Sequence, residues 1–236
     1  IEACGGNGPD TAYVRLETGD TVTVLCGTQS TGQGHQTPYA QIVADALGLP
    51  PERVRVLQGD TALTATGTGT GGSSSIPCGG ASVDGASQKL ADQLKSIAAD
   101  ALEASPTDLE MSGDGVRVAG TDRAVSFAEL AKRPDATVAK RSAQDAFTPT
   151  QPTYPNGTHL VEVEIDPETG EVAIVRYVVV DDFGATLNPL MLAGQVHGGA
   201  VQGIGQALME NTIYDPESGQ LVTATLMDYA LPRAKE

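Results

Sequence analysis

The chain has 236 residues and a formal net charge of −16, from 14 basic and 30 acidic side chains. Nucleic acid and anionic membrane surfaces are therefore poor partners, because few cations are available to neutralise phosphate. Aromatic residues make up 4% of the chain and Trp is absent, which leaves few side chains for base stacking. An apolar content of 40% is enough for a buried core.

Cysteine usage indicates a reducing environment. The three cysteines, Cys4, Cys26 and Cys78, are far apart and odd in number. They form neither a C-x-x-C motif nor a disulfide framework, so we expect a cytoplasmic location. No apolar run reaches the length of a membrane span, and no signal peptide is recognisable. The chain opens on Ile1 and not on Met, so we expect a processed protein or a piece of a longer one.

The first half of the chain combines strand and helix patterns. Thr11–Glu17 and Thr21–Cys26 are alternating, β-branched runs around a tight turn, so they predict a hairpin. Residues 39–47 have the spacing of a helix, and Arg53–Leu57 predicts another strand. A long helix is predicted over Ala81–Leu102.

A smaller hairpin and a short helix follow. Leu109–Ser112 and Gly115–Ala119 predict the two strands, and Ser126–Ala131 predicts a helix with a loose capping box at its start. Residues 132–156 lose periodicity and gain proline. We interpret them as an internal boundary or a long connection.

The second half repeats this order of elements. His159–Ile165 and Glu171–Val180 predict a hairpin. Asn188 followed by proline is a strong start signal for a helix that runs to about residue 211. Leu221–Asp228 predicts a final strand.

These elements predict an α+β fold made of two hairpin-plus-helix units, each a two-layer α/β arrangement. We assign residues 1–133 to the first unit, residues 134–156 to the connection, and residues 157–236 to the second unit, truncated at its C-terminal end.

The stretch GTQSTGQGHQT, residues 27–37, joins a predicted strand to a predicted helix. It contains three glycines, several amides and hydroxyls, and no Asp, Glu, Lys or Arg. At such a turn it suits a large polar ligand held by backbone and amide hydrogen bonds, and it does not suit acid–base chemistry. The simpler alternative is an ordinary connection.

Residues 58–80, QGDTALTATGTGTGGSSSIPCGG, contain almost no large apolar side chains. Their composition is typical of a flexible linker. A glycine-rich loop that leads into a helix N-terminus is also a phosphate-binding arrangement, although the Walker motif is missing here. Both interpretations remain open from the residues alone.

The second-half helix carries amides and glycines on one stripe, at Gln195, Gly198, Gly199, Gln202 and Gln206. Two glycines inside a helix cost about 2 kcal/mol relative to alanine. Close packing against another element and close approach of a polar ligand are the two alternatives.

Histidine and aspartate give little support for a metal site, and we predict none. His35, His159 and His197 are the only histidines and are scattered along the chain. Asp181 and Asp182 follow a predicted strand, where a solvated turn before the next helix is a simpler alternative to a metal ligand or a base.

Three segments together resemble a known family. The first is GTQSTGQGHQT with the following QIVADALG and PPERVRVLQGDT, the second is GTGTGGSSSIPCGGASVDGA, and the third is NPLMLAGQVHGGAVQGIGQAL. They are similar to the C-terminal part of the molybdopterin-binding large subunit of the xanthine dehydrogenase/aldehyde oxidase family, which includes carbon-monoxide-dehydrogenase-type members. The segments cover nearly the whole chain in the family's order.

The resemblance implies a cofactor and the residues that contact it. Family members use molybdenum on a pyranopterin, in bacteria as the molybdopterin cytosine dinucleotide, to oxidise an aldehyde, an N-heterocycle or CO with oxygen from water. By motif position, the implied cofactor contacts are Gly32, Gln33, Gly34, Gly79, Gly80, Ser82 and Gln195. Ser74 stands where relatives commonly have Arg, so any ion pair made by that Arg is absent.

The resemblance also implies partners and a missing group. Electrons leave through iron–sulfur and FAD subunits or domains, and the N-terminal half of the same subunit supplies further contacts. The family's catalytic glutamate lies in a Gly-Val-Gly-Glu motif, which is expected beyond Glu236, so no catalytic residue is assigned. We expect this chain alone to be inactive and to self-associate as a homo-oligomer through its exposed faces.

A hypothesis from another class is a non-enzymatic α/β binding or assembly module whose glycine-rich loops serve packing. The two hypotheses differ in geometry, because cofactor binding requires the three segments to converge on one concave surface. In the packing alternative, they lie far apart.

Overall fold

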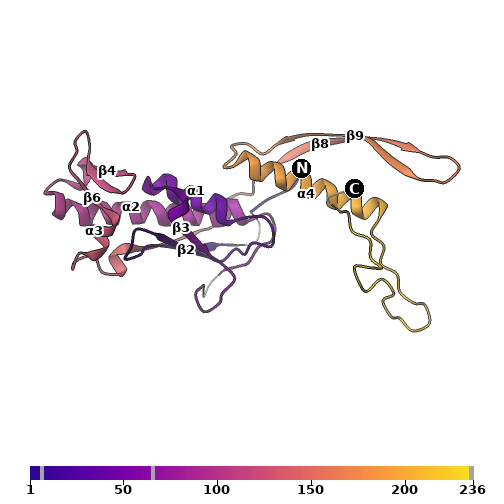
Figure 1. Ribbon diagram of the computed structural model, residues 1–236, viewed down its shortest axis with the longest axis horizontal. Helices are drawn as coiled ribbons and strands as arrows, with labels where there is room; N and C mark the ends of the chain where they lie inside the picture. The colour runs from indigo at the N-terminus through magenta and orange to yellow at the C-terminus, as the bar shows by residue number, and fades with distance from the viewer. Residues whose placement is uncertain (6–7, 65–66, 234–236) are drawn as a thin grey trace. The chain divides into compact units, whose positions relative to one another are not determined.

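The computed structural model describes residues 1–5, 8–64 and 67–233. The chain divides into two compact units, unit 1 (Ile1–Pro155) and unit 2 (Asn156–Glu236), which are coloured from indigo to coral and from coral to yellow in Figure 1.

Unit 1 is built on a four-stranded sheet with the order β3-β2-β1-β7. Its strands are β1 (Asp10–Leu16), β2 (Val22–Cys26), β3 (Val54–Leu57) and β7 (Ser142–Phe147). Strand β1 runs antiparallel to both neighbours, with Val14 opposite Val24 and Ala143, whereas β2 and β3 are parallel. A parallel pair needs a crossover connection, and helix α1 (Gln36–Leu47) lies in it.

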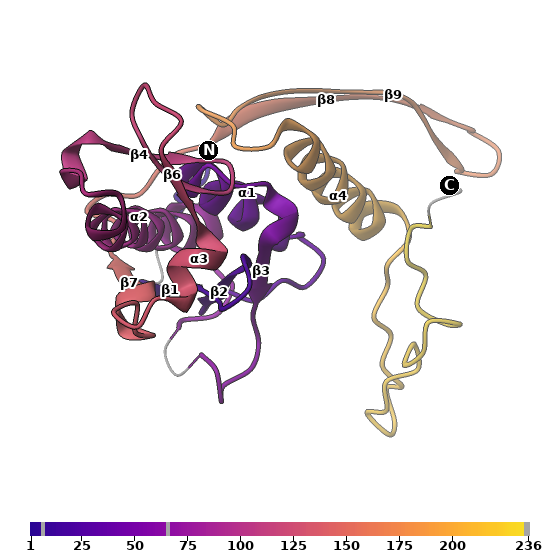
Figure 2. The same ribbon diagram turned by 60° about the vertical axis from the view of Figure 1, so that its left-hand side comes forward.

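Helices α1 and α2 (Ala81–Leu102) pack on one face of this sheet (Figure 2). Alternate residues of β1 from Asp10 to Leu16 are buried, which is the two-residue period of a strand covered on one face. On α2, Leu90 and Leu94 belong to the buried helical stripe that completes the core.

A smaller antiparallel sheet packs against α2 in the same unit. Its strands are β4 (Leu109–Ser112), β5 (Gly115–Val118) and β6 (Ala124–Ser126), and helix α3 (Phe127–Lys132) follows. A full capping box starts α3: Ser126 Oγ accepts from the Glu129 amide at 3.2 Å, and Glu129 Oε2 accepts from the Ser126 amide at 2.9 Å.

Short helical turns connect these elements, at η1 (Pro51–Arg53), η2 (Ser75–Gly80), η3 (Pro106–Asp108) and η4 (Ala139–Arg141). The turn η2 is π-helical and continues directly into α2, so helical backbone extends from Ser75 to Leu102. The start of this long helical segment therefore lies at Ser75.

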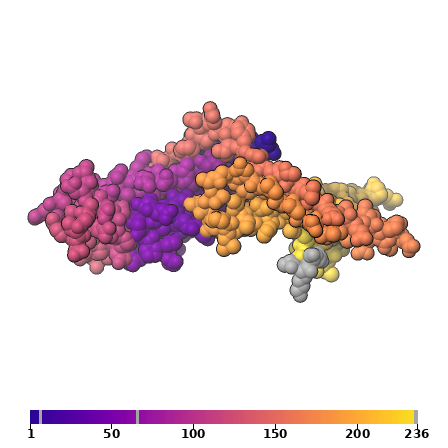
Figure 3. Space-filling view, turned by 90° about the horizontal axis from the view of Figure 1, so that it is seen from above, coloured from indigo at the N-terminus to yellow at the C-terminus, as the bar shows by residue number. Residues whose placement is uncertain are grey.

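Unit 2 consists of a long hairpin and one helix. Its elements are β8 (Asn156–Ile165), β9 (Val172–Asp182) and α4 (Pro189–Leu208). The hairpin is antiparallel with an irregularity between Glu162 and Val163, and the Asn188 side chain caps α4 by accepting from the Met191 amide at 3.0 Å. Every residue of β8 is exposed, and in Figure 3 the hairpin forms a thin strip of coral and orange atoms.

The predicted α+β fold of hairpin-plus-helix units is confirmed, and α2 has the predicted bounds. The predicted final strand is wrong. Near Leu221–Asp228 the structure forms only an isolated bridge between Tyr214 and Leu221, because no neighbouring strand takes up the other backbone hydrogen bonds. Helix α4 also ends at Leu208, three residues before the expected position near 211.

Two strands were not predicted. Strand β7 lies in the segment interpreted as a boundary or connection, and β6 directly precedes α3. The β7 sequence SAQDAF is polar and lacks clean alternation, yet β1 gives it a full set of antiparallel partners. Pairing with a neighbouring strand determined this element, and the local pattern did not.

Candidate functional site

Two glycine-rich loops lie at the ends of secondary-structure elements in unit 1. Loop A (residues 27–34) follows β2 and ends at His35, the N-cap of α1. Loop B (residues 67–74) ends at Ser74, the N-cap of η2. Both loops thus lead into helix N-termini, where backbone N–H groups point outward and favour negative charge.

Direct contacts join loop A to loop B. Thr70 Oγ1 accepts from the Gln29 amide at 2.9 Å and donates to the Gln29 carbonyl at 2.5 Å. A Cβ atom at Gly67 would overlap the Gly27 Cα, so glycine is required where the two backbones meet. These contacts argue against a flexible linker, and the ligand-binding role of loop B remains a prediction. Residues 65 and 66, which were part of that interpretation, lie outside the described residues.

Loop A offers uncharged hydrogen-bond donors. The backbone amides of Ser30, Gly32 and Gln33 have no hydrogen-bond partner among the residues that the structure describes. Gly32 has a left-handed φ of 115°, and a Cβ atom built there would meet nothing within 4 Å. A ligand can therefore approach the backbone at Gly32.

The Gln33 side chain is oriented by its own loop. Its Oε1 accepts from the Thr31 amide at 2.5 Å and from the Thr31 hydroxyl at 3.2 Å. This leaves Gln33 Nε2 as a donor without a partner in the described part of the chain. At Gly34, the amide donates to Ser30 Oγ at 3.1 Å and closes the loop.

Loop B and η2 continue this set of donors. The amides of Ser73 and Ser75 have no hydrogen-bond partner in the described ranges. Ser73 has a φ of 52°, a conformation that side chains other than glycine seldom adopt. This unusual backbone conformation lies just before the start of the helical segment that includes α2.

The predicted contacts Gly79, Gly80 and Ser82 lie behind this surface, in the interior of unit 1. All three are buried. Ser82 Oγ is 2.8 Å from the Asp10 carbonyl and 2.9 Å from the Cys78 carbonyl, and it accepts from the Phe147 amide at 3.3 Å. Its hydroxyl is therefore engaged within the protein. Contact of Gly79, Gly80 and Ser82 with a cofactor remains a prediction.

The predicted contact Gln195 lies in unit 2, on the exposed side of α4. A Cβ atom at Gly198 or Gly199 would meet nothing within 4 Å in the described chain. Packing within the described residues therefore does not explain these two glycines. Convergence of this stripe with loops A and B remains a prediction.

A buried polar cluster beneath the two loops was not predicted. Asp10, Thr28 and His35 are buried polar residues, and Tyr39 is fully buried on α1. Tyr39 Oη lies 2.7 Å from Thr28 Oγ1 and donates to the Ser75 carbonyl at 2.7 Å. The strand pattern could have revealed Asp10, because it shares the buried face of β1 with Ala12, Val14 and Leu16.

Burial shifts the pKa values in this cluster. It raises the pKa of Asp10, although three nearby backbone amides favour the charged carboxylate. It also raises the pKa of Tyr39, and it raises the pKa of Cys26 to about 11. Burial lowers the pKa of His35, so its imidazole is neutral at pH 7. The groups beneath the loops add no positive charge to the site.

Unit 2 contains a separate, mainly apolar hollow of about 700 Å³ between β9 and α4. Tyr177, Asp181 and His197 contribute its polar lining. His159 Nδ1 lies 2.9 Å from Tyr177 Oη, and His159 Nε2 lies 3.7 Å from Asp181 Oδ1. At the end of β9, Asp182 Oδ1 accepts from the Gly184 amide at 2.9 Å, as expected for a turn.

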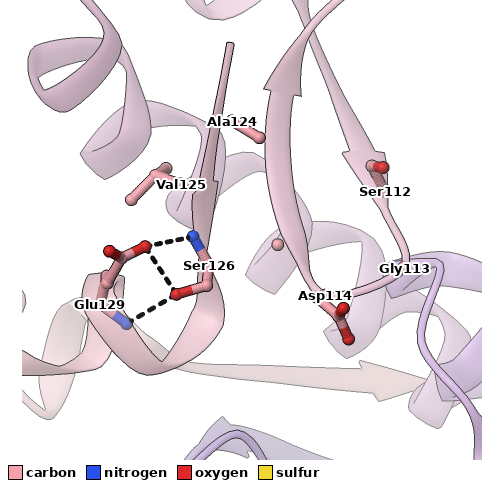
Figure 4. Close-up of a pocket in the computed structure, with 8 residues that line it drawn as sticks. Ser112, Gly113, Asp114, Ala124, Val125, Ser126 and Glu129 are labelled. Atoms are coloured by element: carbon pink, nitrogen blue, oxygen red, sulfur yellow. Dashed lines mark hydrogen bonds between the residues drawn. The ribbon is translucent and has the colours of Figure 1, made fainter. Parts of the chain in front are cut away.

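A smaller hollow of about 460 Å³ lies between the β4–β5 turn and the start of α3 (Figure 4). Asp114, Ser126 and Glu129 are among its polar lining residues. Figure 4 shows that the hydrogen bonds of the capping box engage Ser126 and Glu129 with each other. The polar side chains of Ser126 and Glu129 in this hollow are therefore occupied by the capping box.

Within the described residues, no group of three or more His, Cys, Asp or Glu side chains could hold a metal ion. None of the helices in the described ranges combines the length and the apolar character that a membrane span requires. The three cysteines are all buried and free.

Comparison with known proteins shows the family. Residues 1–236 match the molybdopterin cofactor-binding domain, and the chain belongs to this family. It is 37% identical, over 96% of its length, to the carbon monoxide dehydrogenase large chain of Hydrogenophaga pseudoflava. It is also 37% identical, over 96% of its length, to subunit gamma of the 6-hydroxypseudooxynicotine dehydrogenase complex of Paenarthrobacter nicotinovorans.

Solved structures agree with this family. A Cu,Mo-CO dehydrogenase in its carbon-monoxide-reduced state matches 100% of the chain with a TM-score of 0.82 and 34% identity. Quinoline 2-oxidoreductase from Pseudomonas putida 86 matches 99% of it with a TM-score of 0.81 and 33% identity. The chain spans 29% of the length of the two relatives above and 32% of each solved chain.

Proposed function

We propose that this chain forms part of the binding site for a molybdopterin dinucleotide, in its cytosine form, within the large subunit of a molybdenum-dependent oxidoreductase. The observation that carries the proposal is the direct contact between loops A and B at Gln29 and Thr70, because each of these loops also presents backbone amides without a partner among the described residues. Family membership gives the class of ligand.

The residues of loops A and B fit such a ligand. A dinucleotide presents a pyrophosphate and many hydrogen-bonding groups, and backbone amides at helix N-termini bind phosphate without a basic side chain. The amides of Gly32 and Gln33, the Gln33 Nε2 and the open space at Gly32 supply this chemistry. Because the chain has a net charge of −16, we expect uncharged donors, and not a basic patch, to bind the phosphate groups.

In this proposal, the bound molybdenum centre supplies the redox chemistry that oxidises an aldehyde, an N-heterocycle or CO with oxygen from water. The residues of this chain bind and orient the cofactor. Gln33 donates from Nε2, Gly32 lets the ligand approach, and the amides of Ser73 and Ser75 hold negative charge. The proposed roles of these residues are binding and orientation, and none of them is an acid–base role.

Partner subunits are part of the same proposal. The relatives are a large chain and a subunit of a dehydrogenase complex, and each is about three times as long as the matched region. We propose that the remaining part of a longer subunit, together with iron–sulfur and FAD subunits or domains, completes the enzyme. Strands β8 and β9 expose large apolar residues, which supports contact of this hairpin with other parts of the subunit.

A cytoplasmic location also belongs to the proposal. Cys4, Cys26 and Cys78 are free thiols, and all three are buried. Persistent free thiols suit a reducing compartment.

Replacement of Gln33 tests the binding role. Gln33→Ala in the complete protein removes the Nε2 donor and the acceptor that orients the Thr31 amide. The loss of one or two hydrogen bonds of about 1 kcal/mol each predicts a fivefold to thirtyfold weaker hold on the cofactor. Metal analysis for molybdenum and the fluorescence of the released pterin measure how much cofactor the variant retains.

Gln88→Ala is the matched control, because Gln88 is exposed on α2 and away from both loops. It should leave the molybdenum and pterin content unchanged. Wild-type content in the Gln33→Ala protein would contradict the role of Gln33. Release of CMP from the denatured holoenzyme is expected for the cytosine form, and another nucleotide would contradict that form.

A further inference from the structure

We propose that the buried side chains of Thr28 and Tyr39 hold loop A and η2 at a fixed separation, with Tyr39 as the central positioning residue. This inference rests on the proposed function, because the two segments held in this way are the proposed cofactor loops. Tyr39 belongs to α1 and is fully buried. Its hydroxyl lies between Thr28 of loop A and Ser75 of η2.

The direction of these hydrogen bonds follows from proton counting. A carbonyl oxygen can only accept, so Tyr39 Oη donates its single proton to the Ser75 carbonyl, at 2.7 Å. The 2.7 Å contact between the two hydroxyls then requires Thr28 Oγ1 to donate to Tyr39 Oη. The chain of bonds therefore runs from Thr28 through Tyr39 to Ser75, and it needs both hydroxyls.

The π-helical turn approaches this chain so closely that only glycine fits. A Cβ atom at Gly79 would lie 2.5 Å from Tyr39 Oη, 3.0 Å from Asp10 Oδ2 and 3.2 Å from the Thr28 Cγ2. Gly79 was expected to be a direct cofactor contact. Its geometry assigns it a second role, because its missing side chain permits the turn to pack against Tyr39 and Thr28.

Two further contacts support the same arrangement. Gln58 Nε2 donates to the Thr28 carbonyl at 2.6 Å, which ties the end of β3 to loop A. The Ser82 hydroxyl lies 2.8 Å from the Asp10 carbonyl, which ties the start of α2 to β1. Loop A and η2 are thus attached to the sheet and to each other through buried polar groups.

The cluster also contains an unpartnered acceptor. Asp10 is 1% exposed, and its Oδ2 has no hydrogen-bond partner among the described residues. This oxygen faces the same small space as the position of a Cβ at Gly79.

The test uses substitutions that remove one hydroxyl with little change of shape. Tyr39→Phe removes the donor to Ser75 and the acceptor for Thr28, and Thr28→Val removes the donor to Tyr39. Thr28→Ser keeps that donor and serves as the rescue variant. Tyr13→Phe is the matched control, because Tyr13 is a half-buried residue of β1 on the face opposite the helices.

Two readouts in the complete protein separate positioning from general stability. Amide hydrogen exchange is compared for residues 28–34, for residues 72–76 and for the β4–β6 sheet, and the rate of cofactor loss from the holoenzyme is measured. For Tyr39→Phe and Thr28→Val we expect faster exchange in both loop regions with no change in the β4–β6 sheet. We also expect cofactor loss to be about five to ten times faster.

Thr28→Ser should restore both readouts, and Tyr13→Phe should change neither. Equal loop exchange in Tyr39→Phe and Tyr13→Phe would overturn the inference, as would failure of Thr28→Ser to rescue. If Tyr39→Phe does not fold, Thr28→Val and its rescue decide the outcome. Absence of molybdopterin from the wild-type protein would instead overturn the proposed function, and the exchange measurement would still test the positioning role.

Discussion

Unit 1 and unit 2 share a hairpin-plus-helix plan but differ in how they bury apolar side chains. In unit 1, the faces of β1, β2, α1 and α2 enclose a core that includes fully buried Leu16, Leu47, Leu90 and Leu94. In the described part of unit 2, Gly205 is the only buried residue. Yet β8 and β9 carry large apolar side chains, such as Leu160 at 63% exposure and Val180 at 69%.

This difference shows that the two units obtain stability in different ways. The helices of unit 1 cover a four-stranded sheet, and a closed core results. Unit 2 has a two-stranded hairpin, which by itself is marginal in water and has two edges without a neighbouring strand among the described residues. We therefore expect unit 2 to rely on contacts beyond its own residues, in line with the proposed longer subunit.

The largest expected effect comes from truncating matched leucines in the two units. Leu90→Ala removes a fully buried side chain from the core of unit 1 and should lower the free energy of unfolding by about 2–5 kcal/mol. Leu160→Ala in the exposed β8 should change it by about 0.5 kcal/mol or less. Urea unfolding of this chain measures both.

The same two substitutions in the complete protein test whether unit 2 depends on contacts with other segments. If other segments cover β8 there, Leu160→Ala becomes costly while the cost of Leu90→Ala stays the same. Equal small effects of Leu160→Ala in both forms would contradict the dependence of unit 2 on outside contacts.

A second comparison uses glycines in helical backbone. Gly79→Ala places a Cβ 2.5 Å from Tyr39 Oη and should destabilise unit 1 by about 1–3 kcal/mol through overpacking. Gly199→Ala meets nothing within 4 Å and should stabilise α4 by up to about 1 kcal/mol, because alanine favours the helix. Thermal unfolding followed by circular dichroism measures both.

The cofactor content of these two variants adds information on the amide stripe of α4. Lower cofactor content in a more stable Gly199→Ala protein would favour close approach of a ligand to α4. Destabilisation by Gly199→Ala in the complete protein would favour close packing against another segment. A neutral Gly79→Ala would contradict the tight contact beneath the loops.

The smallest expected effect is a difference in pH dependence. Burial raises the pKa of Asp10 in the folded state above its value near 3.8, so the native protein retains a proton that the unfolded chain releases. Its favourable contribution is complete below about pH 3.8 and is lost as the pH rises through the native pKa. The melting temperature of Asp10→Asn relative to wild type should therefore increase as the pH rises from about 4.

Asp166 in unit 2 gives a matched control of opposite sign. Hydrogen bonds from the Glu168 amide and from Thr169 lower its pKa on an exposed turn. Its contribution is present above about pH 3.8 and is lost as the pH falls through the native pKa. Asp166→Asn should therefore approach wild-type stability as the pH falls. The same pH trend in both variants would contradict burial as the cause at Asp10.

Local sequence patterns predicted the elements that depend on local chemistry. The alternating residues of β1 and β2, the apolar stripe of α2 and the Asn188 cap of α4 each identified an element that the structure contains. Strand β7 and the wrongly predicted final strand show the limit of this approach. A strand forms only where a neighbour accepts its backbone hydrogen bonds, and that neighbour can lie far away in the sequence.

The sequence also predicted loop A as a polar, uncharged ligand loop, since its glycines and amides are adjacent in the chain. It could not predict the contact of Gln29 with Thr70, which are 41 residues apart, or the position of Tyr39 between Thr28 and Ser75. The roles of Gly32, Gln33 and Gln195 toward the cofactor remain predictions.

The sequence by itself thus determined the fold class, the family and the uncharged character of the glycine-rich loops, because these depend on residue type and short-range spacing. Only the tertiary structure decided that the two loops of unit 1 meet and that a buried pair of hydroxyls, from Thr28 and Tyr39, joins loop A to η2. It also decided that many large apolar side chains of unit 2 are exposed. These features depend on which distant segments pack together, and burial then gives Asp10, Tyr39 and Gly79 roles that their residue types alone do not specify.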